Sequence, residues 1–340
     1  MSVDDLDRRL LDAIQAEIPL LPRPFAAVGA VVDLAEREVL ARLERLKHEG
    51  ILRQISAIWD TARLGYRSSL VAASVAPERL DSAAAVVSGH PGVSHNYERD
   101  FHWNLWFTLA VPPDSRLGLE GTVSHLAARA GLDRYRLLPA LRVFKIGVRL
   151  DMEEALTPTR REHAAGPRGA APGARLLDEP DRAVVRMLQE PFPLVPEPCA
   201  ALAAGSGIGV DEVLRRARVL AAAGALRRVA GVLHHRRAGF TANALGVWAV
   251  AEERIAEAGA AIASFRAVSH CYQRATYPDW PYPLFSMVHG RGREACLEVL
   301  DAIATATGIE SRATLWSLRE FKKVRLRYFT PEYAAWERAA

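Results

Sequence analysis

A histidine, a tyrosine and an arginine alternate along one short segment in the second half of the chain. They are His270, Tyr272 and Arg274. Because side chains on a β-strand alternate between faces, this spacing predicts one shared face for all three, with Ser269 and Cys271 on the other. Imidazole titrates near neutral pH, phenol forms hydrogen bonds, and guanidinium binds carboxylates bidentately. The pattern therefore predicts a site that binds carboxylates and moves protons.

The first half of the chain repeats this pattern at His95, Tyr97 and Arg99, 175 residues earlier. Shorter matches, at offsets of 174 to 177 residues, run in order from Asp7 to Lys145 in the first copy. A repeat of this length indicates a fused tandem of one module. The residues between the copies are rich in proline, glycine, alanine and arginine, which is typical of a linker.

Each module predicts the same elements in the same order. Apolar residues at helical spacing predict helices at 5–17 and 34–48, a proline-rich loop lies between them, and residues 51–59 resemble a strand. This is a winged helix-turn-helix outline, and the β-α-β-β-α-β order that follows is ferredoxin-like. The expected fold class is α+β, a tandem repeat of these two domains. The predicted boundaries are helix-turn-helix-like domains at 1–60 and 178–234, ferredoxin-like domains at 61–151 and 235–340, and a linker at 152–177.

Length and composition restrict the class of protein. With 340 residues the chain has room for two or more domains, and its 44 basic and 40 acidic residues leave a net charge of only +4. The start of the chain is crowded with charge and no apolar run is long enough to span a bilayer, so we expect a cytoplasmic protein. Three scattered cysteines supply neither a disulfide framework nor a ligand set for zinc or iron–sulfur.

A helix-turn-helix followed by a ferredoxin-like domain resembles the Lrp/AsnC transcriptional regulators. A more specific resemblance is to the sirohaem decarboxylases, an enzyme family derived from these regulators, which occur as two related subunits or as one fused chain. The segments that carry it are His270-Cys-Tyr-Gln-Arg274, Tyr277-Pro-Asp-Trp-Pro-Tyr282 and Met287-Val-His-Gly290, with His95-Asn-Tyr-Glu-Arg99 and Phe101-His-Trp-Asn-Leu-Trp-Phe107 in the first half.

The resemblance implies non-oxidative decarboxylation of the C12 and C18 acetate side chains of sirohaem to didecarboxysirohaem, in haem or nitrite-reductase haem biosynthesis. Iron-containing sirohaem is then the substrate, and no cofactor and no protein metal site are expected. Sirohaem is the expected partner, and no membrane association is expected. The two modules are expected to pair as an internal pseudo-dimer, which leaves room for further oligomerisation.

The candidate residues divide by the chemistry they supply. His270 and His95 are the expected general acids, and Tyr272 and Tyr97 are expected to position substrate or proton. The candidates for substrate binding are Arg274, Arg99, His289, His102, Trp280, Tyr282, Trp103, Arg319, Lys322, Arg142 and Lys145.

Each candidate also has a structural interpretation. A strand histidine is often a satisfied structural residue, the two strand arginines are suited to salt bridges between domains, and the tryptophans are suited to core packing. The cations on the last strand of each half are suited to a solvated face. A histidine is equally suited to ligating the iron of sirohaem, and the sequence does not separate that role from acid catalysis.

Two other functions fit the outline. One is a DNA-binding regulator of the Lrp/AsnC type, but the recognition helices begin with Asp33, Glu36 and Glu38 in one copy and with Asp211 and Glu212 in the other. Carboxylates there repel phosphates, so we do not expect specific DNA binding. The other is a sirohaem or haem carrier or sensor without chemistry, which needs the same residues.

The two halves are not equivalent. The second half carries four additional residues, Tyr277 to Trp280, and has His289 where the first half has Ala110. We expect the second half to supply the main site, and the insertion to distinguish one end of the substrate from the other.

Overall fold

The computed structural model describes residues 3–146, 177–233 and 242–340, and these form two compact units. Unit 1 is built from residues 1–66, 173–234 and 327–331, and unit 2 from the remainder. Unit 1 therefore holds both helix-turn-helix segments, and unit 2 holds both ferredoxin-like segments. The predicted linker lies outside the described residues except for Leu177. The domain boundaries drawn from the sequence stay a prediction.

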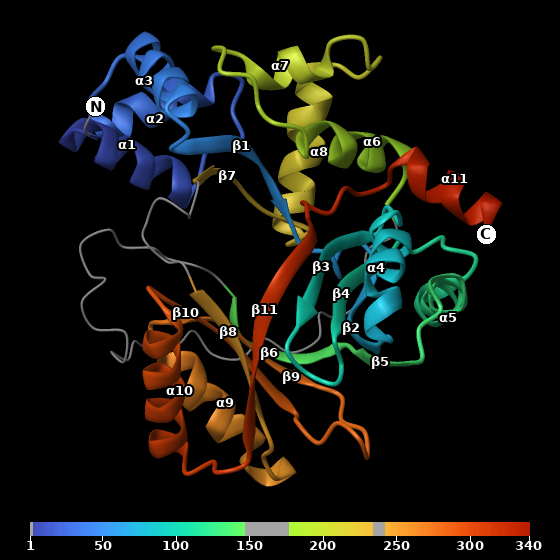
Figure 1. Cartoon of the computed structure of the whole chain (residues 1–340). Coiled ribbons are helices and arrows are strands. Elements are labelled where there is room, and N and C mark those ends of the chain that lie inside the picture. The colour runs from blue at the N-terminus through green and yellow to red at the C-terminus, as the bar shows by residue number, and fades with distance from the viewer. Residues whose placement is uncertain (1–2, 147–176, 234–241) are drawn as a thin grey trace. The chain divides into compact units, whose positions relative to one another are not determined.

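Unit 1 contains two copies of a three-helix segment, each followed by one strand. The two strands pair antiparallel in a two-stranded sheet, with Ala57 opposite Val229, so the two copies share one small sheet (Figure 1). The elements are α1 (Asp5–Ala16), α2 (Pro24–Val32), α3 (Glu36–His48) and β1 (Leu52–Trp59), then α6 (Glu179–Leu188), α7 (Pro198–Ala203), α8 (Val210–Ala222) and β7 (Leu226–Leu233).

The sequence predicts a proline-rich loop between the two helices of each copy, but the end of each proline-rich segment is helical. Helix α2 begins at Pro24 and helix α7 at Pro198. Proline is favoured at the first helical position, because its φ angle is already helical and its missing N–H would have no partner there. Only the earlier prolines of each segment, such as Pro19, lie in the loop.

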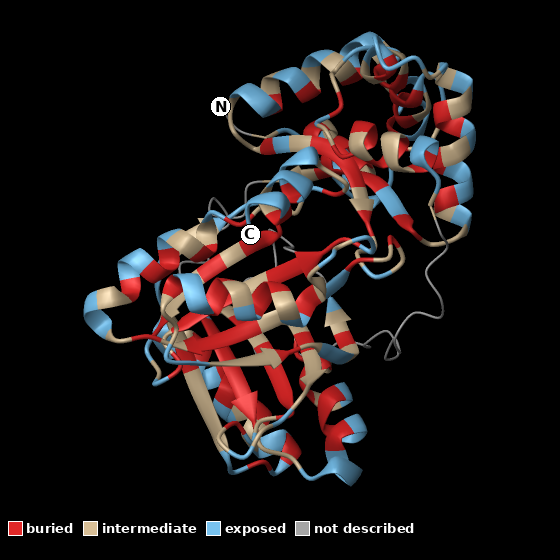
Figure 2. Ribbon diagram, turned by 90° about the vertical axis from the view of Figure 1, so that its right-hand side faces the viewer, coloured by how far each residue is buried: buried red, intermediate tan, exposed pale blue. Residues whose placement is uncertain are grey.

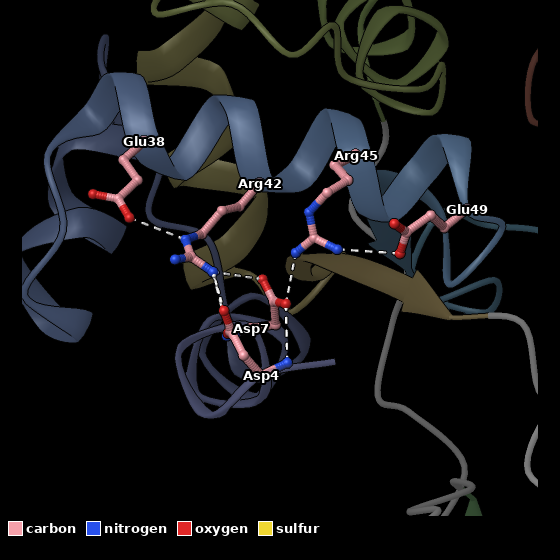
Figure 3. Close-up of polar contacts among 6 residues, drawn as sticks. All are labelled: Asp4, Asp7, Glu38, Arg42, Arg45 and Glu49. Carbon is pink, nitrogen blue, oxygen red and sulfur yellow. Dashed lines mark hydrogen bonds and ion pairs between the residues drawn. The ribbon is translucent and has the colours of Figure 1, made fainter. Parts of the chain in front are cut away.

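A carboxylate–arginine network joins α1 to α3 in unit 1 (Figure 3). The buried carboxylate of Asp7 accepts hydrogen bonds from Arg42 at 3.0 Å and Arg45 at 2.6 Å. Arg42 also binds Asp4 at 2.9 Å, and these contacts raise its pKa. In the second copy Arg216 binds Asp181 at 2.7 Å in the same way. Arg42, Arg45 and Arg216 are therefore already bound to carboxylates of their own unit.

Unit 2 repeats the β-α-β-β-α-β order twice, as the sequence predicts. The first copy comprises β2 (Arg67–Ser74), η1 (Pro77–Arg79), α4 (Leu80–Ser88), β3 (Val93–Arg99), β4 (Leu105–Val111), α5 (Gly118–Ala130), β5 (Arg134–Leu138) and β6 (Ala140–Ile146). The second comprises β8 (Ala242–Trp248), η3 (Glu252–Arg254), α9 (Ile255–Ser264), β9 (Val268–Arg274), β10 (Leu284–Gly290), α10 (Arg293–Thr307) and β11 (Arg312–Lys323), followed by α11 (Pro331–Ala339).

Two strands, β11 and β6, cross from one copy to the other. The strands of both copies form one nine-stranded sheet in the order β5-β2-β4-β3-β11-β8-β10-β9-β6. Strand β11 pairs first with β8 of its own copy and then with β3 of the other. At the two edges of the sheet, β5 pairs with β2 of its own copy and β6 pairs with β9 of the other copy, although only Pro139 separates β5 from β6 along the chain. The last strand expected from the β-α-β-β-α-β order in the first copy is therefore two strands, because proline has no N–H for the ladder and the chain changes partner there.

Helices cover the outer face of each copy. Helices α4 and α5 pack on β2, β3 and β4 around Phe107 and Val123, while α9 and α10 pack on β8, β9 and β10 around Ile262 and Val288. A third cluster joins the inner faces of both copies around Trp106 and Phe285. Figure 2 shows these strands largely buried, whereas the helices alternate between buried and exposed residues. No helix in the described ranges is long and apolar enough to cross a bilayer.

Candidate functional site

The histidine, tyrosine and arginine of each half lie on the inner face of the sheet. Tyr97 lies directly opposite Trp106 on the neighbouring strand, and Tyr272 lies opposite Phe285. Trp106 and Phe285 belong to the inner cluster, whereas Cys271, one position away from Tyr272, contacts helix α9 on the outer face. The predicted alternation therefore holds for the two sets of three.

Ring contacts connect the members of each set. The centroids of His270 and Tyr272 are 6.1 Å apart with their planes 24° from parallel, and the guanidinium of Arg274 lies 4.8 Å from the centre of the Tyr272 ring. In the first half His95 and Tyr97 are also 6.1 Å apart, at 28°. Each half therefore presents an imidazole, a phenol and a guanidinium in a row.

The two serines that precede the histidines are not where strict alternation predicts them. Both strands are irregular at this point, since the register shifts between Val93 and His95 and again between Val268 and His270. An extra residue interrupts the alternation of a strand. The hydroxyl of Ser269 consequently lies 2.8 Å from Nδ1 of His270, and the prediction that put Ser269 on the other face was wrong.

Ser269 also connects His270 to a second histidine. Its Oγ lies 2.8 Å from Nε2 of His289, so one hydroxyl joins two imidazoles. In the first half Ser94 lies 3.0 Å from Nδ1 of His95. The position that corresponds to His289 is occupied there by Ala110. Sequence reasoning missed both serines, although the repeated Val-Ser-His was a signal for them.

Burial sets the charge state of the two central histidines. Burial, with smaller contributions from the charges of His95 and Arg274, lowers the pKa of His270 to about 4. The two imidazoles are thus close enough to influence each other. Burial also lowers the pKa of His95, aided by Lys323 and opposed by Glu320. Both rings are therefore neutral at pH 7. The pKa of each histidine lies below the near-neutral value that the sequence led us to expect.

The two strand arginines are buried cations that bind carbonyl groups. Arg99 donates to the carbonyl of Leu315 at 3.1 Å, and Arg274 donates to that of Leu138 at 2.5 Å, each across the boundary between the halves. Neither forms an ion pair with a carboxylate in the described part of the chain, and the Nε of each has no partner there. Burial lowers the pKa of both to about 10. An unpaired buried guanidinium is unfavourable, so each of these sites is suited to an incoming anion.

The large aromatic candidates are core residues. Trp103 and Trp280 are fully buried in the inner cluster, and the Trp280 ring lies 5.3 Å from that of Trp106. Tyr282 packs 5.1 Å from Trp280 at the edge of the cluster. These rings join the two halves, and of the three only Tyr282 is partly exposed.

The four-residue insertion binds the opposite half. The Tyr277 hydroxyl donates to the carbonyl of Leu137 at 2.7 Å, and Asp279 forms a bidentate ion pair with Arg136 at 2.8 and 3.1 Å. His102 is exposed in the facing turn. Its pKa is lowered, mainly by partial burial of the ring and also by the charge of Arg134, while Asp279 opposes the shift. His102 thus lies beside the insertion and apart from His95.

The four cations of the last strands lie on the helix-covered side. The ammonium of Lys145 donates to the carbonyl of Phe265 at the end of α9. That of Lys322 donates to the carbonyl of Ser88 at the end of α4. Cations stabilise helix C-termini through the helix dipole. The structure does not bring these residues together with the histidines. The other two are Arg319, which pairs with Asp81 and Glu98, and Arg142, whose guanidinium lies over Phe144.

The site contains no arrangement of side chains typical of a resident metal. Across the described ranges, no group of three or more His, Cys, Asp or Glu side chains is placed to hold a metal ion. The donors that do meet are imidazole, phenol, hydroxyl and guanidinium, a set suited to hydrogen bonds, proton transfer and binding of carboxylates.

Comparison with known families accounts for both parts of each module. The family described as "AsnC-like ligand binding domain" matches residues 63–145 and 237–322. The family described as "Siroheme decarboxylase NirDL-like HTH domain" matches residues 7–53 and 181–227. The tandem repeat and the α+β fold class are thereby confirmed.

Curated relatives match almost the whole chain. The siroheme decarboxylase of Hydrogenobacter thermophilus is 41% identical over 328 residues, which is 96% of each chain. The siroheme decarboxylase beta subunit of Methanosarcina barkeri is 42% identical and covers 44% of this chain, so a separate subunit corresponds to one half.

Solved structures agree with these relatives. The crystal structure of the siroheme decarboxylase NirDL superposes with a TM-score of 0.82 at 36% identity and covers 99% of this chain and 98% of its own. The same enzyme with an iron-uroporphyrin III analogue superposes at 0.81. With sequence, repeat and fold matched from end to end, this chain belongs to the siroheme decarboxylase family and is a carboxy-lyase.

Proposed function

We propose that this protein removes the acetate carboxyl groups at C12 and C18 of sirohaem and yields didecarboxysirohaem, for haem or nitrite-reductase haem biosynthesis. The observation that carries the proposal is the pair of buried arginines, Arg99 and Arg274, which lack a carboxylate in the described structure and lie in line with His95 and His270. A macrocycle with many carboxylates supplies the missing anions. The relative solved with an iron-uroporphyrin III analogue supports a tetrapyrrole of this size.

Each arginine is suited to hold one carboxylate of the substrate. Guanidinium–carboxylate pairs are bidentate and strong when shielded from water. Because the two arginines come from different halves and the histidines influence each other, we propose one shared reaction site. In this site Tyr97 and Tyr272, each between a histidine and an arginine, position the substrate.

Decarboxylation needs one proton for each carboxyl group. Loss of CO2 breaks the bond between the carboxyl carbon and the methylene, leaves an electron pair on the methylene carbon, and a proton converts this to a methyl group. No electron enters or leaves, so no reductant or nicotinamide is required. The proton comes from His95 or His270. A bound carboxylate favours the charged form of a nearby imidazole and so raises the low pKa of the empty site.

Anaerobic incubation with sirohaem, followed by mass spectrometry, tests the function. We expect a product lighter by two CO2 without any added reductant. Unchanged sirohaem would overturn the proposal and leave a carrier or sensor. Separate replacement of His95 and His270 tests the shared site, because either variant alone then slows the loss of both carboxyl groups. A gel shift at low salt should show no specific DNA complex.

A further inference from the structure

The hydroxyl of Ser269 lies between two imidazoles. It is 2.8 Å from Nδ1 of His270 and 2.8 Å from Nε2 of His289, and its third neighbour, the Met287 carbonyl, is more distant at 3.4 Å. Ser269 is 4% exposed, so its hydroxyl is largely shielded from bulk water. A strand irregularity at this residue turns the side chain towards both rings.

The hydrogen-bonding capacity of serine leaves two directions for this arrangement, one of them with Ser269 donating to His270. A hydroxyl has one proton to donate and can accept from other donors. If Ser269 donates to Nδ1 of His270, then Nε2 of His289 must donate to Ser269. In that state neutral His270 carries its own proton on Nε2, the nitrogen that does not face the serine.

A neutral imidazole is a poor acid on its own. If His270 gave its Nε2 proton to a carbanion and received nothing in return, an imidazolate would remain, which is unfavourable in a buried site. Burial keeps His270 neutral in the empty protein. A proton that arrives on Nδ1 as the Nε2 proton leaves removes this obstacle.

We propose that Ser269 and His289 form a proton relay behind His270. This inference depends on the proposed function. As the Nε2 proton of His270 forms the new C–H bond, the Ser269 proton passes to Nδ1, and protonated His289 gives its Nε2 proton to Ser269. His289 is left neutral. One solvent proton then adds to Nε2 of His270, the Nδ1 proton of His270 returns to Ser269, and the Ser269 proton returns to Nε2 of His289. This restores the starting state, so each CO2 released consumes one proton.

The first half contains only part of this relay. Ser94 bonds His95 at 3.0 Å, but Ala110 occupies the position that corresponds to His289. The register supports this correspondence, since Val93 pairs with Leu109 as Val268 pairs with Val288. The relay therefore belongs to the second half, and the chain supplies its own matched control.

Single-turnover decarboxylation of bound sirohaem tests the relay. We expect Ser269→Ala to slow CO2 release about 100-fold, in the range of general acid–base effects, while the affinity for sirohaem stays within about twofold of the wild type. Ser94→Ala should slow it less than about fivefold. Ser269→Thr, which keeps the hydroxyl, should recover most of the rate and covers the case in which the alanine variant does not fold.

His289→Gln separates proton transfer from positioning. Glutamine can donate a hydrogen bond to Ser269 but cannot carry a proton through its side chain. The relay predicts that the His289→Gln variant is slow. It also predicts that the wild-type protein shows a solvent deuterium isotope effect from the transfer of more than one proton, and that this effect is smaller in Ser269→Ala. Wild-type rates in His289→Gln, or equal losses in Ser94→Ala and Ser269→Ala, would overturn the relay. A wild-type protein that releases no CO2 would overturn the proposed function instead.

Discussion

Arg99 offers a sharp test of whether the buried arginines bind substrate or stabilise the fold. The residue is 6% exposed, its guanidinium donates to the carbonyl of Leu315 at 3.1 Å, and its Nε has no partner among the described residues. Replacement by methionine keeps a flexible side chain of comparable length while it removes the charge. If the arginine exists to bind an anion, the empty protein should tolerate this change.

The magnitude follows from the pKa of Arg99. Burial lowers it from the ordinary value of an arginine to about 10, and this difference corresponds to about 3 kcal/mol against the charged folded state. At every pH below about 10 the arginine is charged both folded and unfolded, so the full penalty applies at pH 7. Arg99→Met removes it, but leaves the Leu315 carbonyl without its donor, at a cost of about 1–3 kcal/mol. The free energy of unfolding should therefore stay within about 2 kcal/mol of the wild-type value.

Affinity should change far more than stability. Loss of the partner of a desolvated carboxylate costs about 2–5 kcal/mol, so we expect the Kd for sirohaem to rise about 30-fold or more. Visible absorption titration measures the Kd, and urea unfolding measures the stability of the same variant. Arg79→Met is a suitable control, because Arg79 is only partly buried and is paired with Asp133. A loss of stability above about 4 kcal/mol with unchanged affinity would refute the reasoning and make Arg99 structural.

Three further predictions concern stability. Glu337→Ala should lower the melting temperature, with a loss of about 2–4 kcal/mol in the free energy of unfolding, because this carboxylate accepts hydrogen bonds from Ser115 and from two backbone N–H groups before helix α5. Glu337→Gln should lose less, and equal losses in the two variants would refute a charge effect. Acid should weaken the fold, since burial lowers the pKa of His90 to about 3: stability is complete above pH 6.5 and falls as the pH drops below it, by about 1.4 kcal/mol for this residue at pH 5.5. Urea unfolding at pH 7 and 5.5 should therefore differ less in His90→Gln, and an unchanged difference would refute this. Asp7→Ala should cost unit 1 about 3 kcal/mol, because it leaves Arg42 and Arg45 without their buried partner, and a neutral effect in thermal unfolding would contradict it.

Local sequence patterns predicted the secondary structure where one period dominated. The alternation of His270, Tyr272 and Arg274 correctly predicted a strand with a shared face, because side chains of a strand alternate whatever surrounds it. The same rule failed at Ser269, one residue earlier, where an irregularity in pairing interrupts the alternation. The irregularity depends on the partner strand, and nothing in the residues themselves signals it.

The cationic candidates illustrate a second kind of limit. Lys145 and Lys322 lie on β6 and β11, the strands that cross between the two copies. In the sequence their charge alone favoured a role in binding carboxylates. In the structure both side chains lie on the outer face, where each donates a hydrogen bond to a carbonyl at the C-terminus of a helix. Which side of a crossing strand faces the core is decided by the strands of the two copies with which it pairs, and that is a tertiary property.

The sequence by itself determined the tandem repeat, the β-α-β-β-α-β order of the ferredoxin-like segments and the identity of the groups in the candidate site. These follow from spacing and residue type, which act over a few residues. Only the tertiary structure decided that strands β5–β6 and β11 cross between the halves, that His95 and His270 approach each other, and that Ser269 lies between His270 and His289. Those relations join residues far apart in the chain, and they exist because the inner faces of the two modules can be buried only against each other.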